Sequence, residues 1–443
     1  MSDANEPLEP DDPGQLPSFW LWVLETLRLS VRPCGEDLFE FSVPEGQRGD
    51  FDGREVVRVA VRASRGTGPG TADVLAVDSP LGGRLLRRLQ AWGPFVPAVP
   101  RHQPVSVHQL APHLFAPYRV TGGTVRLSGC SLEDHPLLRY TYLVRRDNGE
   151  AAARLVHVDA SPRPEPLEPA LSASLRLDEL APRLVRPPRV SDDQLGAWLS
   201  YGEQQAALLT TADRRAEFVV AAVIWCKRAS GKLLFEFGDR SAERPFDAWA
   251  QHLVDGVATP PPFRCPVTGR ESYHVTATDD GRITVAESIA CCECSGRRVL
   301  DSDLETCAVT GKRALAEFLR SCSVTGERVL ADQLVRCTQC SQEVSPHAIL
   351  AGRCAACRSL QPISRDDPRL ARILGEYPKL DRWTRWRLAE TDAVYVLTAS
   401  SLLRRLLLVL DKESLEASHV AESFRLGRDW PEVPRAQWAE FLG

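Results

Sequence analysis

Residues 292–336 repeat one pattern three times, as CECSGRRVLDSDLET (292–306), CAVTGKRALAEFLRS (307–321) and CSVTGERVLADQLVR (322–336). Each segment begins with a cysteine, has a glycine four positions later, and then carries a Val-Leu or Ala-Leu pair. The phrase CPVTG at residues 265–269 is an outlying copy of the same opening. Because self-similarity at a fixed period marks repeated supersecondary units, the sequence predicts an array of similar turns.

The array ends in two complete Cys-x-x-Cys pairs, Cys337 with Cys340 and Cys354 with Cys357. Two thiolates on one tight turn can hold zinc at bond lengths of about 2.3 Å, and a second such turn completes a tetrahedral shell. The sequence therefore predicts a zinc-ribbon site with zinc as the cofactor. Buried free thiols are the alternative, because cysteine is also common in protein cores.

The earlier repeats keep the first cysteine but carry a hydroxyl, at Ser295, Thr310 and Thr325, where the second thiolate would stand. A hydroxyl does not replace a thiolate on zinc, but it can hydrogen-bond to the backbone and hold the same turn. We therefore expect turns that keep the knuckle shape without a metal. In that arrangement three leucines occupy equivalent inward positions: Leu300, Leu315 and Leu330.

A second metal site is also suggested by the sequence. Cys291 and Cys294 form another Cys-x-x-Cys, one residue out of step with the repeat. Cys307 and Cys322, or Cys265, would have to complete its shell. The alternative is that these cysteines pack as small apolar side chains.

The Cys-x-x-Thr-Gly repeats at residues 307–313 and 322–328, with the copy at 265–270, resemble cysteine-repeat regions that accompany some bacterial Swi/Snf-type helicases. The segments 39–44 and 78–81 are also similar to sequences that follow such helicase motors. The chain carries no nucleotide-binding loop and no motor. The resemblance therefore implies a detached accessory part that works beside a motor or another partner.

Composition favours a cytoplasmic protein. The 443 residues carry a net charge of −5, and the 13 cysteines are an odd number, which does not suit a disulfide framework. We expect no secretion signal and no membrane segment, since the most apolar stretches are too short or too charged to cross a bilayer.

Proline-rich breaks divide the chain into five expected parts and predict an α+β, multidomain protein. The expected parts are a disordered acidic tail (1–16), an N-terminal α+β domain (17–160), a middle α+β domain (170–262), the cysteine-repeat zinc-ribbon region (263–360) and a C-terminal α+β domain (361–443). Within the middle domain, residues 219–227 and 232–237 flank Ala229-Ser230-Gly231 and predict a β-hairpin.

Catalytic signatures are lacking in the sequence: it has no glycine-rich phosphate loop, no Gly-x-Ser-x-Gly and no His-Glu-x-x-His. Three neighbouring histidines in a proline-rich stretch have no ligand partner at metal spacing, and we expect a solvated loop there: His102, His108 and His113. Cys226 lies between Trp225 and Lys227 on an apolar strand, where burial is expected rather than a lysine-activated thiol. Glu390 and Asp392 are expected at a solvated strand edge.

The charge of the cysteine array does not by itself favour nucleic-acid binding. Residues 264–358 hold twelve basic and twelve acidic side chains, so the array has no net basic field. Further on, Arg382, Arg385 and Arg387 interleave with Trp383 and Trp386, a mixture that can stack on bases. The simpler interpretation places the tryptophans in a core and the arginines on a solvated face.

These observations predict a non-catalytic, zinc-binding interaction or scaffold module, an accessory subunit of a larger bacterial-type assembly with a protein partner. One alternative is a nucleic-acid-binding accessory factor that works beside a helicase. Another is an enzyme with an unrecognised site. No small-molecule substrate is indicated.

Overall fold

A computed structural model describes residues 16–35, 37–60, 72–146, 153–427 and 429–442. The chain forms two compact units, the first ending at Pro262 and the second beginning at Phe263. Several sheets combine with helices, which confirms the α+β class. The finer division into five parts stays a prediction. Residues 1–15 of the expected tail lie outside the described residues, whereas Leu16 is buried in the core of the first unit.

The first unit is organised by a long, mostly antiparallel sheet in the order β8-β7-β10-β5-β9, with β11 paired to β10. Its strands are β5 (Phe95–Pro100), β7 (Thr124–Arg146), β8 (Arg154–Ala160), β9 (Leu180–Pro182), β10 (Arg214–Phe237) and β11 (Arg240–Trp249). Residues on β7 and β10 alternate between two apolar faces, as the strand period of two requires. Both faces therefore need a cover.

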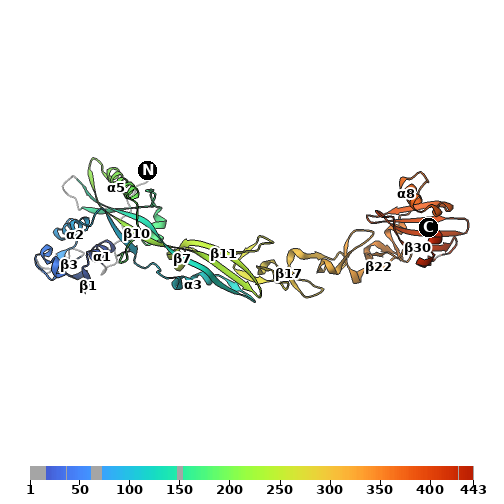
Figure 1. Ribbon diagram of the computed structural model, residues 1–443, viewed down its shortest axis with the longest axis horizontal. Coiled ribbons are helices and arrows are strands. Elements are labelled where there is room, and N and C mark those ends of the chain that lie inside the picture. The colour runs from blue at the N-terminus through green and yellow to red at the C-terminus, as the bar shows by residue number, and fades with distance from the viewer. Residues whose placement is uncertain (1–15, 36, 61–71, 147–152, 428, 443) are drawn as a thin grey trace. The chain divides into compact units, whose positions relative to one another are not determined.

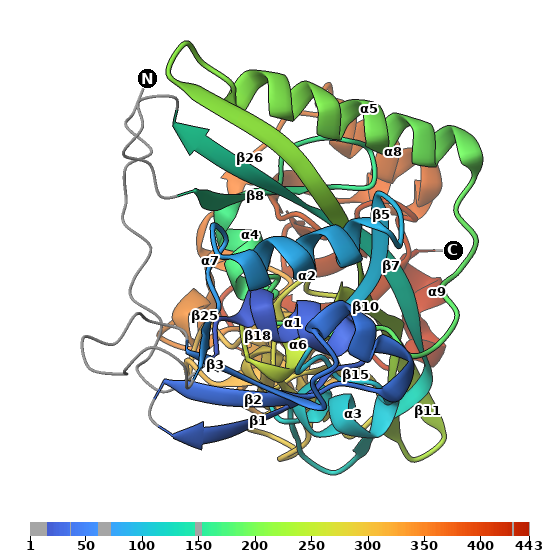
Figure 2. The same cartoon turned by 90° about the vertical axis from the view of Figure 1, so that its left-hand side faces the viewer.

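Helices supply these covers. The long helix α5 (Asp192–Leu209) packs Trp198 against Tyr140 and Trp225 on one face of the sheet. Helices α1 (Ser18–Thr26) and α2 (Pro80–Gln90) pack on the alternate residues of the same strands. Figure 2 shows α5 lying along the β7–β8–β10 face, with α1 and α2 on the other side of the strands.

Smaller elements complete the first unit. A four-stranded sheet has the order β1-β2-β3-β4, in which β2 pairs antiparallel with both β1 and β3. The remaining elements are β1 (Ser30–Gly35), β2 (Leu38–Ser42), β3 (Val56–Ala60), β4 (Asp73–Val74), β6 (Arg119–Val120), α3 (Val107–Phe115), α4 (Pro169–Ser174) and α6 (Ala250–Val254). Within the described residues, no helix of either unit is long and apolar enough to span a bilayer.

The expected hairpin at residues 219–237 is wrong. Strand β10 runs straight through Ala229, Ser230 and Gly231, which pair with β7 on one side and β11 on the other. Gly231 serves close packing rather than a turn, since a Cβ there would lie 2.2 Å from the carbonyl oxygen of Gly129. A glycine inside a strand often marks such an approach of two backbones.

Gly231→Ala is therefore expected to destabilise the pairing of β7 with β10 by about 1–3 kcal/mol, the usual cost of overpacking. The matched control is Gly129→Ala on the facing strand, where an added Cβ meets nothing within 4 Å. Hydrogen exchange of peptides from β10 measures the difference. Equal exchange in the two variants would contradict the close-packing account.

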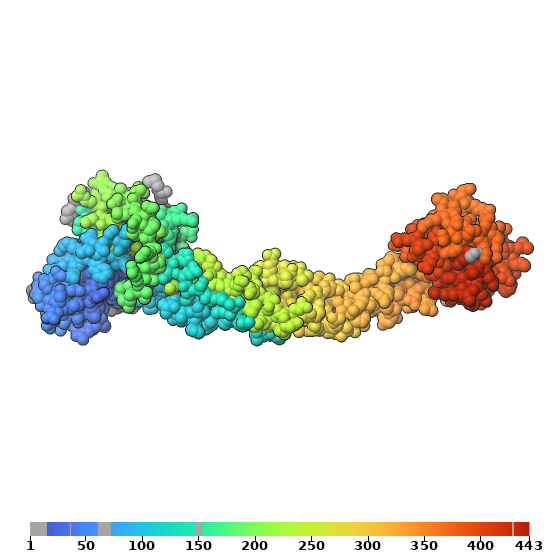
Figure 3. Space-filling model, in the orientation of Figure 1, coloured from blue at the N-terminus to red at the C-terminus, as the bar shows by residue number. Residues whose placement is uncertain are grey.

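The second unit begins with the cysteine array. Two hairpins come first and pair β12 (Phe263–Arg264) with β13 (Glu271–Ser272) and β14 (His274–Ala277) with β15 (Ile283–Val285). Four further hairpins follow, and each encloses one cysteine turn. They pair β16 (Ile289–Cys291) with β17 (Arg298–Leu300), β18 (Leu304–Thr306) with β19 (Arg313–Leu315), β20 (Leu319–Ser321) with β21 (Arg328–Leu330), and β22 (Val335–Arg336) with β23 (Glu343–Val344). Short 3-10 turns connect successive hairpins, and in Figures 1 and 3 the array is the narrow yellow-to-orange part of this unit.

The array ends at the hairpin of β24 (Ile349–Leu350) and β25 (Arg353–Cys354), followed by α7 (Ala355–Arg358). An antiparallel sheet then takes the order β26-β27-β28-β29-β30. Its elements are β26 (Gln361–Pro362), α8 (Pro368–Glu376), β27 (Thr384–Glu390), β28 (Val394–Ser400), β29 (Arg404–Asp411), β30 (Ala417–Phe424) and α9 (Trp438–Phe441). One face of the sheet packs on α8 and α9.

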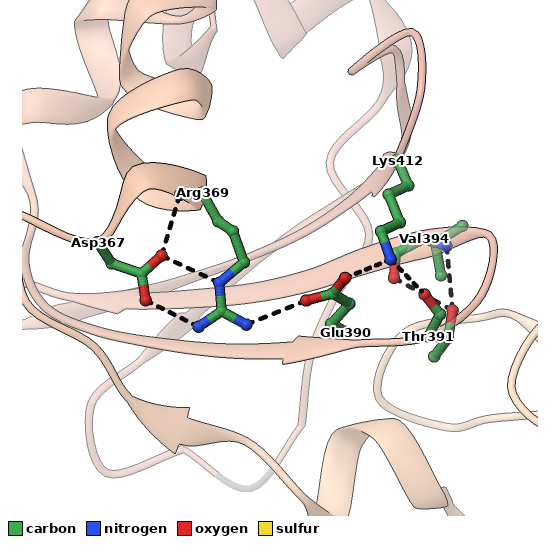
Figure 4. A network of polar contacts seen from close by, with 6 residues as sticks. All are labelled: Asp367, Arg369, Glu390, Thr391, Val394 and Lys412. Carbon is green, nitrogen blue, oxygen red and sulfur yellow. Dashed lines mark hydrogen bonds and ion pairs between the residues drawn. The ribbon is translucent and has the colours of Figure 1, made fainter.

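A chain of ion pairs ties α8 to this sheet (Figure 4). Asp367 caps the helix by accepting from the backbone amide of Arg369 at 2.9 Å. The guanidinium of Arg369 bridges Asp367 and Glu390, and Glu390 also pairs with Lys412. The Arg369 guanidinium holds the pKa of Asp367 at about 2, below its ordinary value. Glu390 is thus a structural link between elements.

Candidate metal centre

Five cysteine turns of the second unit share one backbone geometry. In each, the cysteine carbonyl accepts from the amide four residues later, and the cysteine amide donates to the carbonyl five residues later, at 2.8–3.0 Å. The residue four positions after the cysteine has a positive φ of 69–72° at Gly269, Gly296, Gly311 and Gly326. Ser341 takes this place in the last turn with φ 53°. The predicted repetition of one turn is therefore observed, and glycine occupies the position where a left-handed backbone is needed.

Successive repeats are joined through the cysteine sulfurs. Cys292 Sγ accepts from the amide of Leu315 at 3.5 Å, and Cys307 Sγ accepts from that of Leu330 at 3.4 Å. Cys322 Sγ accepts likewise from the amide of Ser345 at 3.2 Å, and Cys337 Sγ from that of Cys354 at 3.3 Å. A buried thiol thus holds each turn to the next repeat, which explains why the first cysteine recurs where no metal is held.

These hydrogen bonds also alter the thiols. Burial raises the pKa of Cys292, but hydrogen bonds from Ser295 and from backbone amides outweigh it and lower the pKa to about 7. The hydroxyl that replaces the second thiolate is therefore a partner of the first cysteine, as well as a residue of the turn.

The leucine positions agree with the prediction only in part. Leu300 and Leu330 are buried, but Leu315 is only partly buried. The consistently buried position is the one before each leucine, occupied by Val299, Ala314 and Val329. In the middle repeat this buried position holds the smaller Ala314, and the leucine after it is the less buried one.

The four predicted ligands converge. The sulfur atoms of Cys337, Cys340, Cys354 and Cys357 all lie within 4.8 Å of one another, and all four residues are buried. Cys337 Sγ is 3.8 Å from Cys357 Sγ, and Cys340 Sγ is 3.7 Å from Cys354 Sγ. Four bonds of about 2.3 Å to a central tetrahedral ion require sulfur–sulfur edges of about 3.8 Å. The spacing therefore fits one metal ion and is far too long for a disulfide.

The electrostatics of the four thiols also favour a bound metal ion. Hydrogen bonds from Cys340, Cys354 and Cys357 lower the pKa of Cys337, whereas those from Cys337, Cys340 and Cys354 raise the pKa of Cys357. The four groups thus compete for ionisation when no cation balances them. A divalent ion removes that competition, because a coordinating thiol is deprotonated outright.

The centre is built into a larger core. Its four cysteines share one buried cluster with Ala389, Val394, Val396, Leu407 and Val409 on the face of the β27–β30 sheet opposite α8. His419 on β30 is also buried nearby, and burial lowers its pKa while Glu432 and Cys337 act in the opposite direction. No spacing in the sequence signals this packing, because the sheet residues follow the cysteines only after an intervening helix.

The second candidate set does not converge. Among the described residues, the only group of metal-type ligands within reach of one ion is the four-cysteine cluster. Cys291 and Cys294 are exposed, while Cys307 and Cys322 are buried in separate repeats. The one-residue offset places Cys291 on a strand and Cys294 on the outside of its turn, so the thiols of this pair face solvent.

The other candidate residues of the sequence are either buried in a core or exposed on the surface. Cys226 is buried, and this burial raises the pKa of its thiol, which argues against lysine activation. His102 Nε2 lies 3.4 Å from Glu179 Oε2. His108 and His113 are exposed on α3 and not in the expected loop, and none of the three histidines belongs to a ligand cluster within the described residues. Trp383 and Trp386 are core residues beneath the sheet, so they do not offer free faces for stacking on bases.

A small cavity of about 220 Å³ in the first unit bears on the enzyme alternative. It is lined in part by Arg139, Thr141 and His157, and Thr141 Oγ1 lies 3.1 Å from His157 Nδ1. Burial, with the charge of Arg139, lowers the pKa of His157 to about 4. The Arg139 guanidinium is occupied by Asp159 at 2.7 Å. The cavity is smaller than the roughly 300 Å³ at which ligand pockets begin.

Comparisons with protein-family models, with curated proteins and with solved structures find no match to this chain. The resemblance to helicase-associated cysteine repeats accordingly stays a prediction.

Proposed function

We propose that this protein is a non-catalytic, zinc-binding interaction module that acts as an accessory subunit of a larger assembly. The observation that carries the proposal is the closure of the metal centre. All four positions of a tetrahedral shell are filled by buried cysteines. Catalytic zinc sites use three protein ligands and keep one position for water, whereas four-cysteine sites are structural.

Zinc is favoured over other metals by the donor set. Four thiolates in tetrahedral geometry are typical of zinc or of iron–sulfur chemistry, and the measured edges suit a single ion. Bound there, the ion would join the last two cysteine turns of the array, which pack against the C-terminal sheet. Its role would be to hold a surface in shape.

Stacked repeats support the interaction role. Repeating units build extended surfaces that suit a macromolecular partner. The Cys-x-x-Thr-Gly resemblance supports a position beside a motor protein that this chain does not contain. An accessory role agrees with both features.

The test is chromatography of the tagged full-length protein in extract of its native host. The wild-type chain is expected to elute in an assembly larger than the free chain, and a Cys354→Ser, Cys357→Ser variant is expected to elute as the free chain. The control Cys291→Ser, Cys294→Ser alters an exposed pair and is expected to stay in the assembly. Substrate turnover that one polar substitution abolishes, with folding and assembly intact, would refute the non-catalytic proposal.

A further inference from the structure

A groove of about 1280 Å³ lies beside the metal centre in the second unit, with Cys357 in its wall. We call it the arginine groove, because five arginines line it: Arg353, Arg358, Arg385, Arg387 and Arg405. Asp429 is the one acidic side chain among its described lining residues. The volume exceeds the roughly 300–1,000 Å³ of small-molecule pockets, so the groove suits an extended ligand.

The arginines come from two walls. Arg353 on β25 and Arg358 on α7 belong to the metal-binding turn, while Arg385 and Arg387 on β27 belong to the sheet. The buried cluster that contains the four cysteines and sheet residues holds these walls together. The groove is therefore shaped by the fold, and the metal centre supports one of its sides.

Four of these arginines are exposed and form no ion pair with any described residue: Arg353, Arg358, Arg385 and Arg387. Other arginines of this domain have partners of several kinds. Arg365, Arg369 and Arg404 pair with carboxylates, Arg372 donates to backbone carbonyls, and Arg382 and Arg435 lie over aromatic rings. Unpaired arginines that line one groove create a positive potential that draws in anions.

Backbone strain marks one of them. Arg385 has φ 53°, in the left-handed region that residues with a Cβ rarely adopt, and the β27–β28 register shifts between Thr384 and Arg387. Bulges of this kind re-aim side chains and gather beside functional sites. Strained residues persist where the surrounding structure maintains them, and they cluster at ligand sites.

The groove also contains a planar platform. The guanidinium of Arg405 stacks over the Trp430 ring at 4.7 Å from its centroid, and its Nη2 donates to Gly427 O at 2.6 Å. Unlike Trp383 and Trp386, Trp430 lines the groove and is only partly buried. Stacked aromatic and guanidinium planes are the surfaces on which unpaired bases stack.

We propose that the arginine groove binds a single-stranded nucleic acid, with phosphates on the unpaired arginines and bases against Trp430 and Arg405. The inference rests on the proposed function and names the chemistry of one partner. A zinc–tetrathiolate centre carries two negative charges, but the five arginines exceed these together with Asp429. The groove therefore stays positive with the metal bound.

A single strand suits the groove better than a duplex or an acidic protein. In a duplex the base faces are already stacked on one another, so they are not free to stack on an aromatic ring in the groove. An acidic peptide would use the charges but has no planar bases for the platform. Arginines and a stacking surface within one groove are the combination found in single-strand binding channels.

Fluorescence anisotropy of the zinc-loaded full-length protein tests the proposal, with a labelled thymidine oligonucleotide of about 20 nucleotides as probe. Arg385→Ala with Arg387→Ala is expected to weaken binding at least about tenfold. It should also reduce the slope of log affinity against log salt concentration by about 1.4 in magnitude. Each phosphate contact on a single strand contributes about 0.7 to that slope, and two arginines are removed. Trp430→Ala should weaken binding at least about fivefold.

The matched control is Lys312→Ala with Arg320→Ala, which removes the same charge from exposed positions of the array outside the groove. It is expected to bind like the wild type, and all variants should retain one zinc per chain.

The inference is overturned if the wild type does not bind the probe, if groove and control variants bind equally, or if polyglutamate or the matching duplex competes as well as the single strand. If the arginine variants lose the probe but stay in the host assembly, the inference is supported and the two proposals are separated. If the wild type does not bind the oligonucleotide but still elutes in the host assembly, single-strand binding is contradicted and the accessory role is not.

Discussion

The double variant Cys354→Ser, Cys357→Ser is expected to lose its metal ion completely and to unfold the end of the cysteine array. The wild type should contain one zinc per chain, because four buried sulfurs form a single site with edges of 3.7–3.8 Å. Structural zinc sites of this kind contribute about 10–16 kcal/mol of apparent binding free energy near neutral pH, and that energy is spent on folding. Elemental analysis and hydrogen exchange of residues 337–358 measure the two effects.

The chain provides its own control for this experiment. Cys291→Ser, Cys294→Ser removes the same Cys-x-x-Cys spacing from an exposed turn and should keep the metal and the protection of residues 337–358. A wild-type protein without stoichiometric metal would contradict the assignment. Loss of the metal from the control variant would show that Cys291 and Cys294 contribute to metal binding.

Leu330→Ala is expected to cost about 2–5 kcal/mol of local stability in the array, the usual range for a buried leucine. Leu330 is 5% exposed and packs in one cluster with Val329, Leu319 and Cys307. Leu315→Ala should cost less, because its side chain is only partly buried. Hydrogen exchange of peptides within residues 292–336 measures the opening free energy in each variant.

Leu350→Ala is the control for this series. Leu350 lies in the last hairpin of the array and is 63% exposed, so its truncation should change stability by no more than about 0.5 kcal/mol. Equal losses for Leu330→Ala and Leu350→Ala would contradict the inward placement of the repeat leucines. Equal losses for Leu330→Ala and Leu315→Ala would contradict the expectation that the less buried leucine contributes less to stability.

Local spacing was enough to predict the array and the metal site. The 15-residue period, the glycine after each turn and the two complete Cys-x-x-Cys pairs all act within a few residues of one another. Their geometry is set by short backbone turns, as the recurring positive φ at Gly296, Gly311 and Gly326 shows. For such features the neighbours along the chain are also the neighbours in space.

Long-range packing decided the rest, and sequence patterns misjudged it. Gly231 fits a turn in the sequence, yet it lies inside a strand because the backbone of β7 approaches it closely. Trp383 and Arg385 are two residues apart, but one enters the core while a bulge turns the other to the groove. Arg353 and Arg405 meet at one groove only because the metal-binding turn packs on the C-terminal sheet. Periodicity records which face of an element is apolar, but it does not record which distant element covers that face, and the arginine groove depends on that choice.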